Sequence, residues 1–169
     1  MKKIGFGGGC HWCTEAYFQI LKGVSKVEQG WISSNNEHSD LSEAVIVHYD
    51  DSIISLNILI TVHLHTHSST SNHSLRAKYR SAVYTFEEHQ NHLAYSTIRE
   101  LQSDFEKPII TRVLPFQSFK LNEQDQLNYF QKHSDNQFCK NYIHPKLKFI
   151  IQNFSQQLKE NDPIKKIKL

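Results

Sequence analysis

The glycines of this chain are confined to one short stretch near its start. All six lie between Gly5 and Gly30, and none occurs from Trp31 to Leu169. Three of them directly precede a cysteine, in the run GGGCHWC. Glycine allows the backbone a positive φ and allows a ligand to approach the main chain closely. The stretch therefore predicts a tight loop that presents Cys10, and we look for the chemistry there first.

The length and composition fit a single globular domain. The 169 residues are 38% hydrophobic and include 10 Phe, 7 Tyr and 2 Trp, which can form a full core without disulfides. The net charge is only +2 and the one basic cluster is the closing KKIKL, so we expect no nucleic-acid partner.

The chain also lacks the signals of an exported or membrane protein. Its first residues are too poor in apolar side chains for a signal peptide, and no run reaches the roughly 18 apolar residues of a membrane span. We therefore expect a cytoplasmic monomer that does not bind membranes. In that compartment thiols stay reduced, so Cys10, Cys13 and Cys139 are expected to be reactive or metal-binding rather than structural.

The hydrophobic pattern predicts elements in the order β-α-β-β-α-β. Strands are expected over 3–7, 24–32, 41–49 and 80–86, with helices over 11–22 and 55–65. Gly23 is expected to close the first helix and Ser55 to cap the second. A helix around 87–105, a strand over 109–116 and a polar, helical remainder interrupted by Pro145 and Pro163 follow.

This order is typical of the ferredoxin-like, split β-α-β arrangement, in which helices cover one face of an antiparallel sheet. The expected fold class is α+β, a two-layer sandwich with a C-terminal helical extension. We expect one domain over residues 1–169, with a core over 3–116 and the extension over 117–169.

Cys10 is expected at the start of the first helix. Unpaired backbone N–H groups and the positive end of the helix dipole favour a thiolate there. The dipole supplies roughly 0.3–2 kcal/mol, less than the roughly 2.7 kcal/mol that would make the thiolate the major form at pH 7, so a further polar partner is needed. Cys13 completes a Cys-x-x-Cys pair in which the two sulfurs can meet.

Four blocks of the chain, between residues 3 and 150, carry a resemblance to a known family. They are GFGGGCHWCTEAYFQILKGVSKVEQGW, SEAVIVHYDDSIIS, KYRSAVY and QFCKNYIHPKL. In the same order they are similar to the G-C-F-W-x-x-E, H-A-E-x-V-x-V-x-Y-D-P-x-x-I-S, Q-Y-R-S-x-I-Y and Y-C-x-x-x-I-x-P-K blocks of the type A peptide methionine sulfoxide reductases. The resemblance implies a thiol-dependent reductase of methionine S-sulfoxide, free or peptide-bound, without a metal cofactor.

Several roles are implied by this resemblance. Cys10 corresponds to the nucleophile that attacks the sulfoxide sulfur, and Trp12 to a wall of the pocket for the substrate methyl group. Glu43 and Tyr79 correspond to donors to the sulfoxide oxygen. This assignment is chemically sensible because the oxygen leaves only when protonated, and a carboxyl shielded from water can keep or share a proton near neutral pH.

The attack would leave Cys10 as a sulfenic acid, which a second thiol condenses to a disulfide. Cys139 matches the resolving cysteine of the family, while the spacing of Cys13 makes it a competitor for that role. Thioredoxin, as the external reductant, would then restore the thiols.

The residues expected around the substrate depart from the family pattern. His11 replaces a phenylalanine, Trp31 a tyrosine and Ser74 an acidic residue, and a shorter segment between Trp31 and Glu43 lacks a tyrosine that donates to the oxygen. We keep His11, Trp12, Trp31 and Ser74 as candidate substrate-binding residues. Beside the nucleophile, His11 could act as a cation that lowers the pKa of Cys10 or as a base that takes its proton.

A second group of histidines raises the question of a metal. On a helix, His63 and His67 can share one face while His65 points away, which gives an incomplete ligand set. His67 also matches a histidine at a helix end in the family, so we assign no metal site.

Two other functions stay open at this point. The departures around the pocket suggest a divergent enzyme that uses the Cys10 thiolate on another small sulfur-containing or electrophilic substrate. The third hypothesis is a metal or redox sensor built from Cys10, His11, Cys13 and the histidine loop.

Overall fold

The computed structural model describes residues 1–162; Pro163 and the closing KKIKL lie outside the described residues. The first half of the chain follows the predicted order. It consists of β1 (Lys2–Gly7), α1 (His11–Gln19), β2 (Val24–Ser33), β3 (Ser42–Tyr49), α2 (Leu56–Thr66) and β4 (Ala82–Thr85). In the sheet these strands are adjacent in the order β4-β1-β3-β2, and all three pairings are antiparallel. The predicted α+β, ferredoxin-like core is therefore confirmed.

The sheet extends beyond this core, because one strand joins it at each edge; the strand predicted over 109–116 is one of the two. The complete order is β5-β4-β1-β3-β2-β6, where β5 (Arg112–Pro115) runs parallel to β4 and β6 (Ser118–Leu121) runs antiparallel to β2. The sheet is thus mixed rather than antiparallel, and the prediction of an entirely helical or coil segment from residue 117 is wrong at β6. This four-residue strand has too little alternation to be recognised, and the free edge of β2 supplies its backbone partners.

The end of α1 also differs from the prediction. The helix stops at Gln19 with Ile20 as its cap, so Gly23 does not close it but lies in the turn that leads into β2. Gly23 has a φ of 85°, and a Cβ there would approach Ile54 Cγ2 to 2.8 Å. The cap of α2 is as predicted, because the Ser55 hydroxyl accepts a hydrogen bond from Ile58 N at 3.4 Å.

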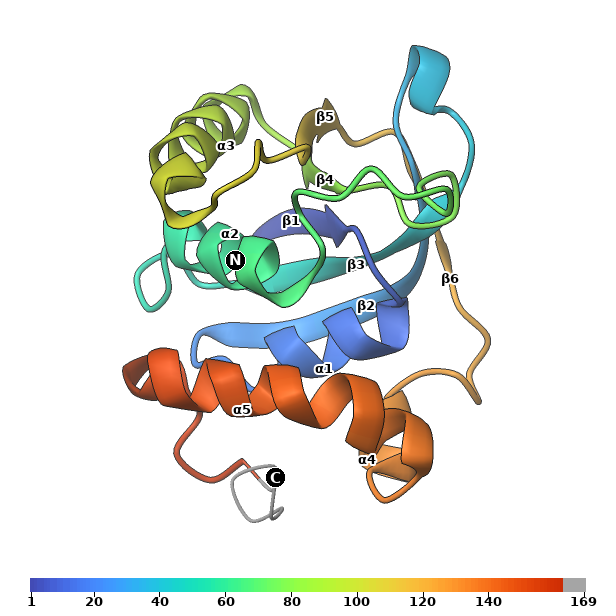
Figure 1. Cartoon of the computed structure of the whole chain (residues 1–169), viewed down its shortest axis with the longest axis vertical. Coiled ribbons are helices and arrows are strands. Elements are labelled where there is room, and N and C mark those ends of the chain that lie inside the picture. Colours follow the sequence, from blue (N-terminus) through green and yellow to red (C-terminus); the bar gives the residue numbers. More distant parts are fainter. Residues whose placement is uncertain (163–169) are drawn as a thin grey trace.

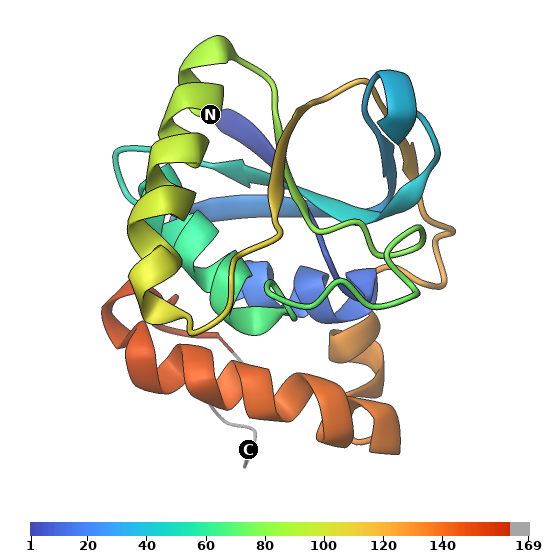
Figure 2. The ribbon, with the colours of Figure 1, turned by 45° about the horizontal axis from the view of Figure 1, so that its top comes forward.

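The helices cover one face of the sheet (Figure 1). α1 and α2 pack on that face, where Phe6 of β1 stacks on Phe18 of α1 with ring centroids 4.7 Å apart. α3 (Glu88–Leu101) lies beside α2, and α5 (His144–Asn153) crosses α1 on the side away from the sheet (Figure 2). No helix within residues 1–162 is long and apolar enough to cross a membrane.

Short helical segments complete the chain. The turns η1 (Asn36–His38), η2 (Gln102–Asp104) and η4 (Ser155–Gln157) are 3₁₀-helical, α4 is Tyr129–His133, and η3 (Cys139–Ile143) is a π-helical turn. η3 runs directly into α5, so the third cysteine is held at the beginning of the helix that covers α1.

Candidate active site

The glycine loop places Cys10 at the very start of α1. Gly8 has a φ of 149°, and a Cβ there would overlap the ring of His67, so the loop fits tightly against the end of α2. Cys10 is the N-cap residue, and its carbonyl oxygen accepts hydrogen bonds from the backbone N–H of Cys13 and of Thr14, each at 3.1 Å. The sulfur therefore lies at the helix end where backbone N–H groups are unpaired.

The pKa of the Cys10 thiol is lowered, chiefly because the Cys13 thiol donates a hydrogen bond to its sulfur. The backbone N–H groups of Trp12 and Cys13 also lower the pKa, whereas burial and the charge of Glu43 oppose the shift. The Cys13 thiol is therefore the further polar partner that Cys10 needs, because the helix dipole alone is too weak to make its thiolate the major form at pH 7. Its own pKa is raised, first by the hydrogen bond to Cys10 and then by burial, so Cys13 stays a protonated donor.

A cavity of about 520 Å³ opens beside Cys10. It lies between the start of α1, the end of α2, the loop that precedes β4 and the π-helical turn. Of the predicted site residues, Cys10, Cys13, Ser74 and Tyr79 line this cavity. The remaining walls are Gly8, Gly9, Thr14, Tyr17, His63, Thr66, His67, Ser68, His73, Leu75, Phe138, Tyr142 and Lys146.

Cys139 lies close to this pair of thiols but outside the cavity wall. Its side chain is fully buried, and its backbone N–H donates to Asn136 Oδ1 at 2.8 Å. Burial, followed by the charge of Cys10, raises the pKa of Cys139. All three cysteines are free thiols.

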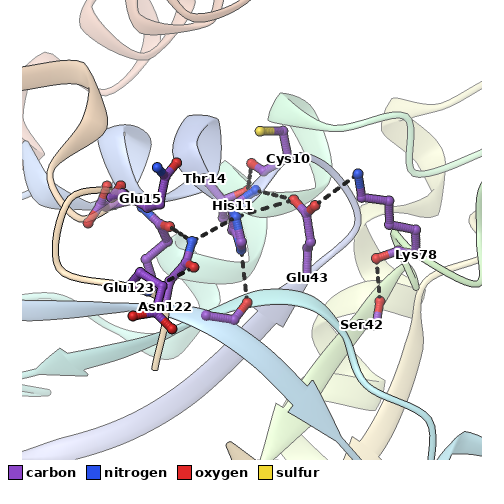
Figure 3. Close-up of polar contacts among 12 residues, drawn as sticks. Cys10, His11, Thr14, Glu15, Ser42, Glu43, Lys78, Asn122 and Glu123 are labelled. Carbon is purple, nitrogen blue, oxygen red and sulfur yellow. Dashed lines mark hydrogen bonds and ion pairs between the residues drawn. The ribbon is translucent and has the colours of Figure 1, made fainter. Parts of the chain in front are cut away.

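The predicted oxygen donors Glu43 and Tyr79 are linked by a lysine. Glu43 is buried on β3; its Oε2 accepts a hydrogen bond from His11 N at 3.0 Å, and its Oε1 lies 3.4 Å from Lys78 Nζ (Figure 3). The same ammonium group lies 5.1 Å from the ring centre of Tyr79. Both oxygens of Glu43 thus face N–H donors.

The ring of His11 does not face the cavity. Its Nδ1 donates to the carbonyl oxygen of Gly30 at 3.0 Å, and its Nε2 accepts from Asn122 Nδ2 at 3.2 Å. Burial lowers the pKa of His11, so the ring is neutral. The roles of cation or base beside Cys10 gain no support, because consecutive helical side chains point about 100° apart and both ring nitrogens already have partners.

The two tryptophans stand behind the site rather than in its wall. Trp12 stacks on Tyr129 with ring centroids 4.0 Å apart and meets Phe138 edge-on at 5.6 Å. Phe138 lines the cavity, and Trp12 contacts Phe138 without lining the cavity itself. Trp31 packs edge-on against His11 at 5.1 Å, on the sheet side.

The histidines of α2 are used for packing. The rings of His63 and His67 stack at 4.1 Å, and His67 bonds through Nδ1 to the His63 carbonyl oxygen and through Nε2 to the Ser81 hydroxyl. His65 instead pairs with Asp104 at 3.1 Å. In residues 1–162 no three side chains of His, Cys, Asp or Glu are grouped so that they could hold a metal ion.

Two further residues that shape the site, Arg76 and Tyr17, were not predicted from the sequence. Arg76 donates through Nη1 to the carbonyl oxygens of Gly8 and Tyr79, both at 2.8 Å, and so ties the glycine loop to the loop that precedes β4. Tyr17 reaches Cys13 and the carbonyl oxygen of Tyr142. The spacing of Tyr17, four residues after Cys13, could have suggested its contact, whereas no local signal points to Arg76.

An activated cysteine at a helix start, with a second thiol on its sulfur, defines a thiol-dependent oxidoreductase. The comparisons with known proteins give the family. The model of the family described as peptide methionine sulfoxide reductase matches residues 2–159, and this chain belongs to that family.

Individual relatives agree with this assignment. The chain is 33% identical to the peptide methionine sulfoxide reductase MsrA of Psychrobacter sp. (strain PRwf-1), over 94% of this chain and 99% of the relative. It is 30% identical to the MsrA of Acinetobacter baumannii (strain SDF), over 95% and 99%. The fold is similar to that of reduced Mxr1 from Saccharomyces cerevisiae, with a TM-score of 0.74 and 20% identity over 83% of this chain and 90% of Mxr1.

Proposed function

We propose that this chain reduces methionine S-sulfoxide, free or peptide-bound, with Cys10 as the nucleophile. The observation that carries the proposal is the position of Cys10: it caps α1, receives a hydrogen bond from the Cys13 thiol and opens into the cavity. A cysteine with a lowered pKa at an accessible site is reactive as its thiolate.

The reaction transfers one oxygen atom. The Cys10 thiolate attacks the sulfoxide sulfur, the S–O bond of the substrate breaks, and the oxygen ends on Cys10 as a sulfenic acid. The substrate sulfur is reduced, the Cys10 sulfur is oxidised, and the proton lost from the thiol ends on the sulfenic oxygen. Tyr79 in the cavity wall would donate to the oxygen, while Phe138, backed by Trp12, offers an apolar surface for the methyl group.

Cys13 is the thiol that we propose to resolve the sulfenic acid. Its sulfur already contacts that of Cys10, and the N-cap and third helical positions keep both sulfurs at one helix end. Oxidation of Cys10 removes the thiolate whose hydrogen bond and charge raise the pKa of Cys13, so Cys13 can then attack. Formation of the Cys10–Cys13 disulfide releases one water molecule. Cys139, the resolving cysteine implied by the family resemblance, is fully buried in η3 and lies outside the cavity wall, whereas Cys13 lines the cavity with Cys10.

The disulfide must be reduced from outside, and we propose thioredoxin as the reductant. A crystal structure of Mxr1 from Saccharomyces cerevisiae in complex with Trx2 has a similar fold, with a TM-score of 0.60 and 21% identity over 76% of this chain and 84% of Mxr1. We further propose a monomeric cytoplasmic enzyme, with one domain over 1–169, that needs no metal.

The direct test is turnover of methionine S-sulfoxide by the purified protein with dithiothreitol. The R epimer is the matched substrate control, and Cys10→Ser is the matched inactive variant, expected to lose at least about 10³-fold in kcat/KM. Activity without dependence on Cys10, or no turnover at all, would reject the proposal. Rapid alkylation of Cys10 near pH 7 without turnover would instead favour an enzyme acting on another electrophile.

A second measurement separates the two resolving thiols. After one turnover without reductant, peptide mass mapping should find the Cys10–Cys13 disulfide in the wild type and in Cys139→Ser. A sulfenic acid that persists in Cys139→Ser, although Cys13 is intact, would assign resolution to Cys139.

A further inference from the structure

The cavity beside Cys10 has one charged side chain in its wall that the proposed reaction does not use. Among residues 1–162 the wall contains no Asp or Glu, and Lys146 is its only Lys or Arg. Lys146 is exposed, and no carboxylate of the described part of the chain forms an ion pair with it. The cavity therefore carries a positive charge that no carboxylate of its own wall balances.

The helical segment that contains η3 and α5 directs this lysine toward the cavity. Phe138, Tyr142 and Lys146 follow one another at four-residue intervals, and all three line the cavity. Residues four apart lie on one face of a helix. The rings of Phe138 and Tyr142 lie 5.0 Å apart, and the Tyr142 carbonyl oxygen accepts a hydrogen bond from Tyr17 of α1 at 3.2 Å. This face is thus fastened to α1, with Lys146 as its next member.

The charge of Lys146 acts on another residue of the cavity wall. Burial is the main reason why the pKa of His67 is low, and the charges of Arg76 and Lys146 lower it further. His67 and Lys146 both line the cavity, so the field of the lysine crosses space that a substrate would fill. Burial also lowers the pKa of His63, so neither of these two rings adds a second positive charge near pH 7.

This arrangement favours an anionic group on the substrate. The methionine sulfoxide side chain itself is uncharged, so Lys146 can only act on the groups that flank it. Ser74, which replaces an acidic residue of the family pattern, lines the same cavity, so the wall offers no carboxylate to a cationic group. A carboxylate beside the sulfoxide would instead pair with the Lys146 ammonium group.

We propose that Lys146 makes this chain selective for methionine S-sulfoxide with a carboxylate beside the oxidised side chain. The carboxylate belongs either to a neighbouring Asp or Glu of a peptide or to the free amino acid itself. This inference rests on the proposed sulfoxide reductase function and names its substrate class. Lys146 binds the flanking carboxylate and takes no part in the transfer of oxygen to Cys10.

The test compares substrates in pairs whose members differ in one carboxylate. The first pair consists of blocked peptides in which Glu or Gln precedes methionine S-sulfoxide, and in the second pair Glu or Gln follows it. The third pair is free methionine S-sulfoxide and its amide. For each pair we would measure the ratio of the two kcat/KM values with dithiothreitol as reductant.

Three variants test the lysine. Lys146→Met removes the charge and keeps much of the side-chain length, whereas Lys146→Glu reverses the charge. Lys148→Met is the matched control, because Lys148 is exposed on the same helix but does not line the cavity.

We expect the wild type to prefer the carboxylate member of at least one pair about three- to fivefold, mainly through KM, as for an exposed ion pair. The ratio should fall to about 1 in Lys146→Met and below 1 in Lys146→Glu, and should stay at the wild-type value in Lys148→Met. In the wild type the preference should also disappear near about 1 M salt, because salt screens exposed charges.

A preference that depends on Lys146 supports the inference, and the pair that shows it identifies the source of the carboxylate. Equal kcat/KM values within every pair in the wild type would overturn the inference. A preference that survives in Lys146→Met would overturn it as well. A wild-type protein that reduces no member of any pair would instead reject the proposed function itself, so the two failures are distinguishable.

Discussion

Cys10 and His11 are neighbours in the chain, yet they belong to two chemically different regions. Cys10 opens into the cavity, where its sulfur contacts another thiol and has a lowered pKa. His11 points to the sheet side, where both ring nitrogens are engaged and burial keeps the ring neutral. Both side chains are polar and close to the glycine loop, but only Cys10 has a group free to react.

The region around His11 is a closed hydrogen-bond network. Asn122 donates to His11 and, at 2.8 Å, to Gln29 Oε1, while Gln29 Nε2 donates to Glu15 at 2.8 Å. Glu15 also accepts from the backbone N–H groups of Asn128 and Tyr129, so the network fastens the segment after β6 to α1 and β2. The two regions show that polar groups with all their hydrogen bonds made, such as His11, stabilise the structure around the nucleophile. The reactive group, Cys10, is the one that faces the cavity.

The largest effect is expected from removing Glu15, which tests whether the hydrogen-bond network around His11 stabilises the fold. We expect Glu15→Ala to lower the free energy of unfolding by roughly 3 kcal/mol, because the buried amide of Gln29 and the backbone N–H groups of Asn128 and Tyr129 lose their acceptor. Chemical denaturation measures the loss, with the exposed Glu106→Ala as control. A loss below about 1 kcal/mol would mean that the network contributes little to the scaffold.

Acid should have the next largest effect, through the histidines in the cavity wall. Burial lowers the pKa of His67 to about 4, whereas an unfolded histidine titrates near 6.5. The unfolded state therefore takes up the proton first, and stability falls as the pH drops below about 6.5. Between pH 7.5 and 5 we expect His67 alone to reduce the free energy of unfolding by about 2 kcal/mol.

Denaturation curves at pH 7.5, 6 and 5 would measure this dependence, and His67→Gln should flatten it. An equally steep pH dependence in His67→Gln would assign it to other groups, of which the buried His63 is the first to consider, since burial lowers its pKa as well.

A smaller effect is expected for the thiol pair. In Cys13→Ala the hydrogen bond to the Cys10 sulfur is lost, so the pKa of Cys10 rises and its alkylation by iodoacetamide at pH 7 slows about three- to tenfold. Cys139→Ser is the matched control and should alkylate at the wild-type rate. If Cys13→Ala alkylates as fast as wild type, the helix end alone activates Cys10.

The smallest effect on activity is expected at His11. His11→Phe removes the contacts to Gly30 and Asn122, so it should cost about 1 kcal/mol of stability and change kcat/KM by less than about threefold. Thermal denaturation and steady-state kinetics with methionine S-sulfoxide measure the two quantities. A large loss of kcat/KM in a stable His11→Phe protein would place His11 in the active site and contradict its assignment as a structural residue.

Much of the fold could be predicted from the sequence. The short apolar run in β1, the alternation in β3, the helical spacing in α1 and the Ser55 cap are local patterns, and they predicted the order of the ferredoxin-like core. β6 and the parallel pairing of β5 could not be predicted, because short edge strands obtain their hydrogen bonds from a neighbour distant in the chain. The predicted end of α1, at residue 22, lies beyond the observed end at Gln19, because Gly23 belongs to a turn packed against Ile54 and does not cap the helix.

The amino-acid sequence by itself determined the nucleophile candidate, since a glycine loop followed by a helix start is a local feature that leaves Cys10 at an exposed dipole end. It also determined the family, through four blocks in a fixed order. Only the tertiary structure decided what surrounds the sulfur. Side-chain direction and burial turned His11 toward the sheet, brought Lys78 to Glu43, and gathered Tyr79, His63 and Phe138 around one cavity, because these contacts join elements that are far apart in the chain.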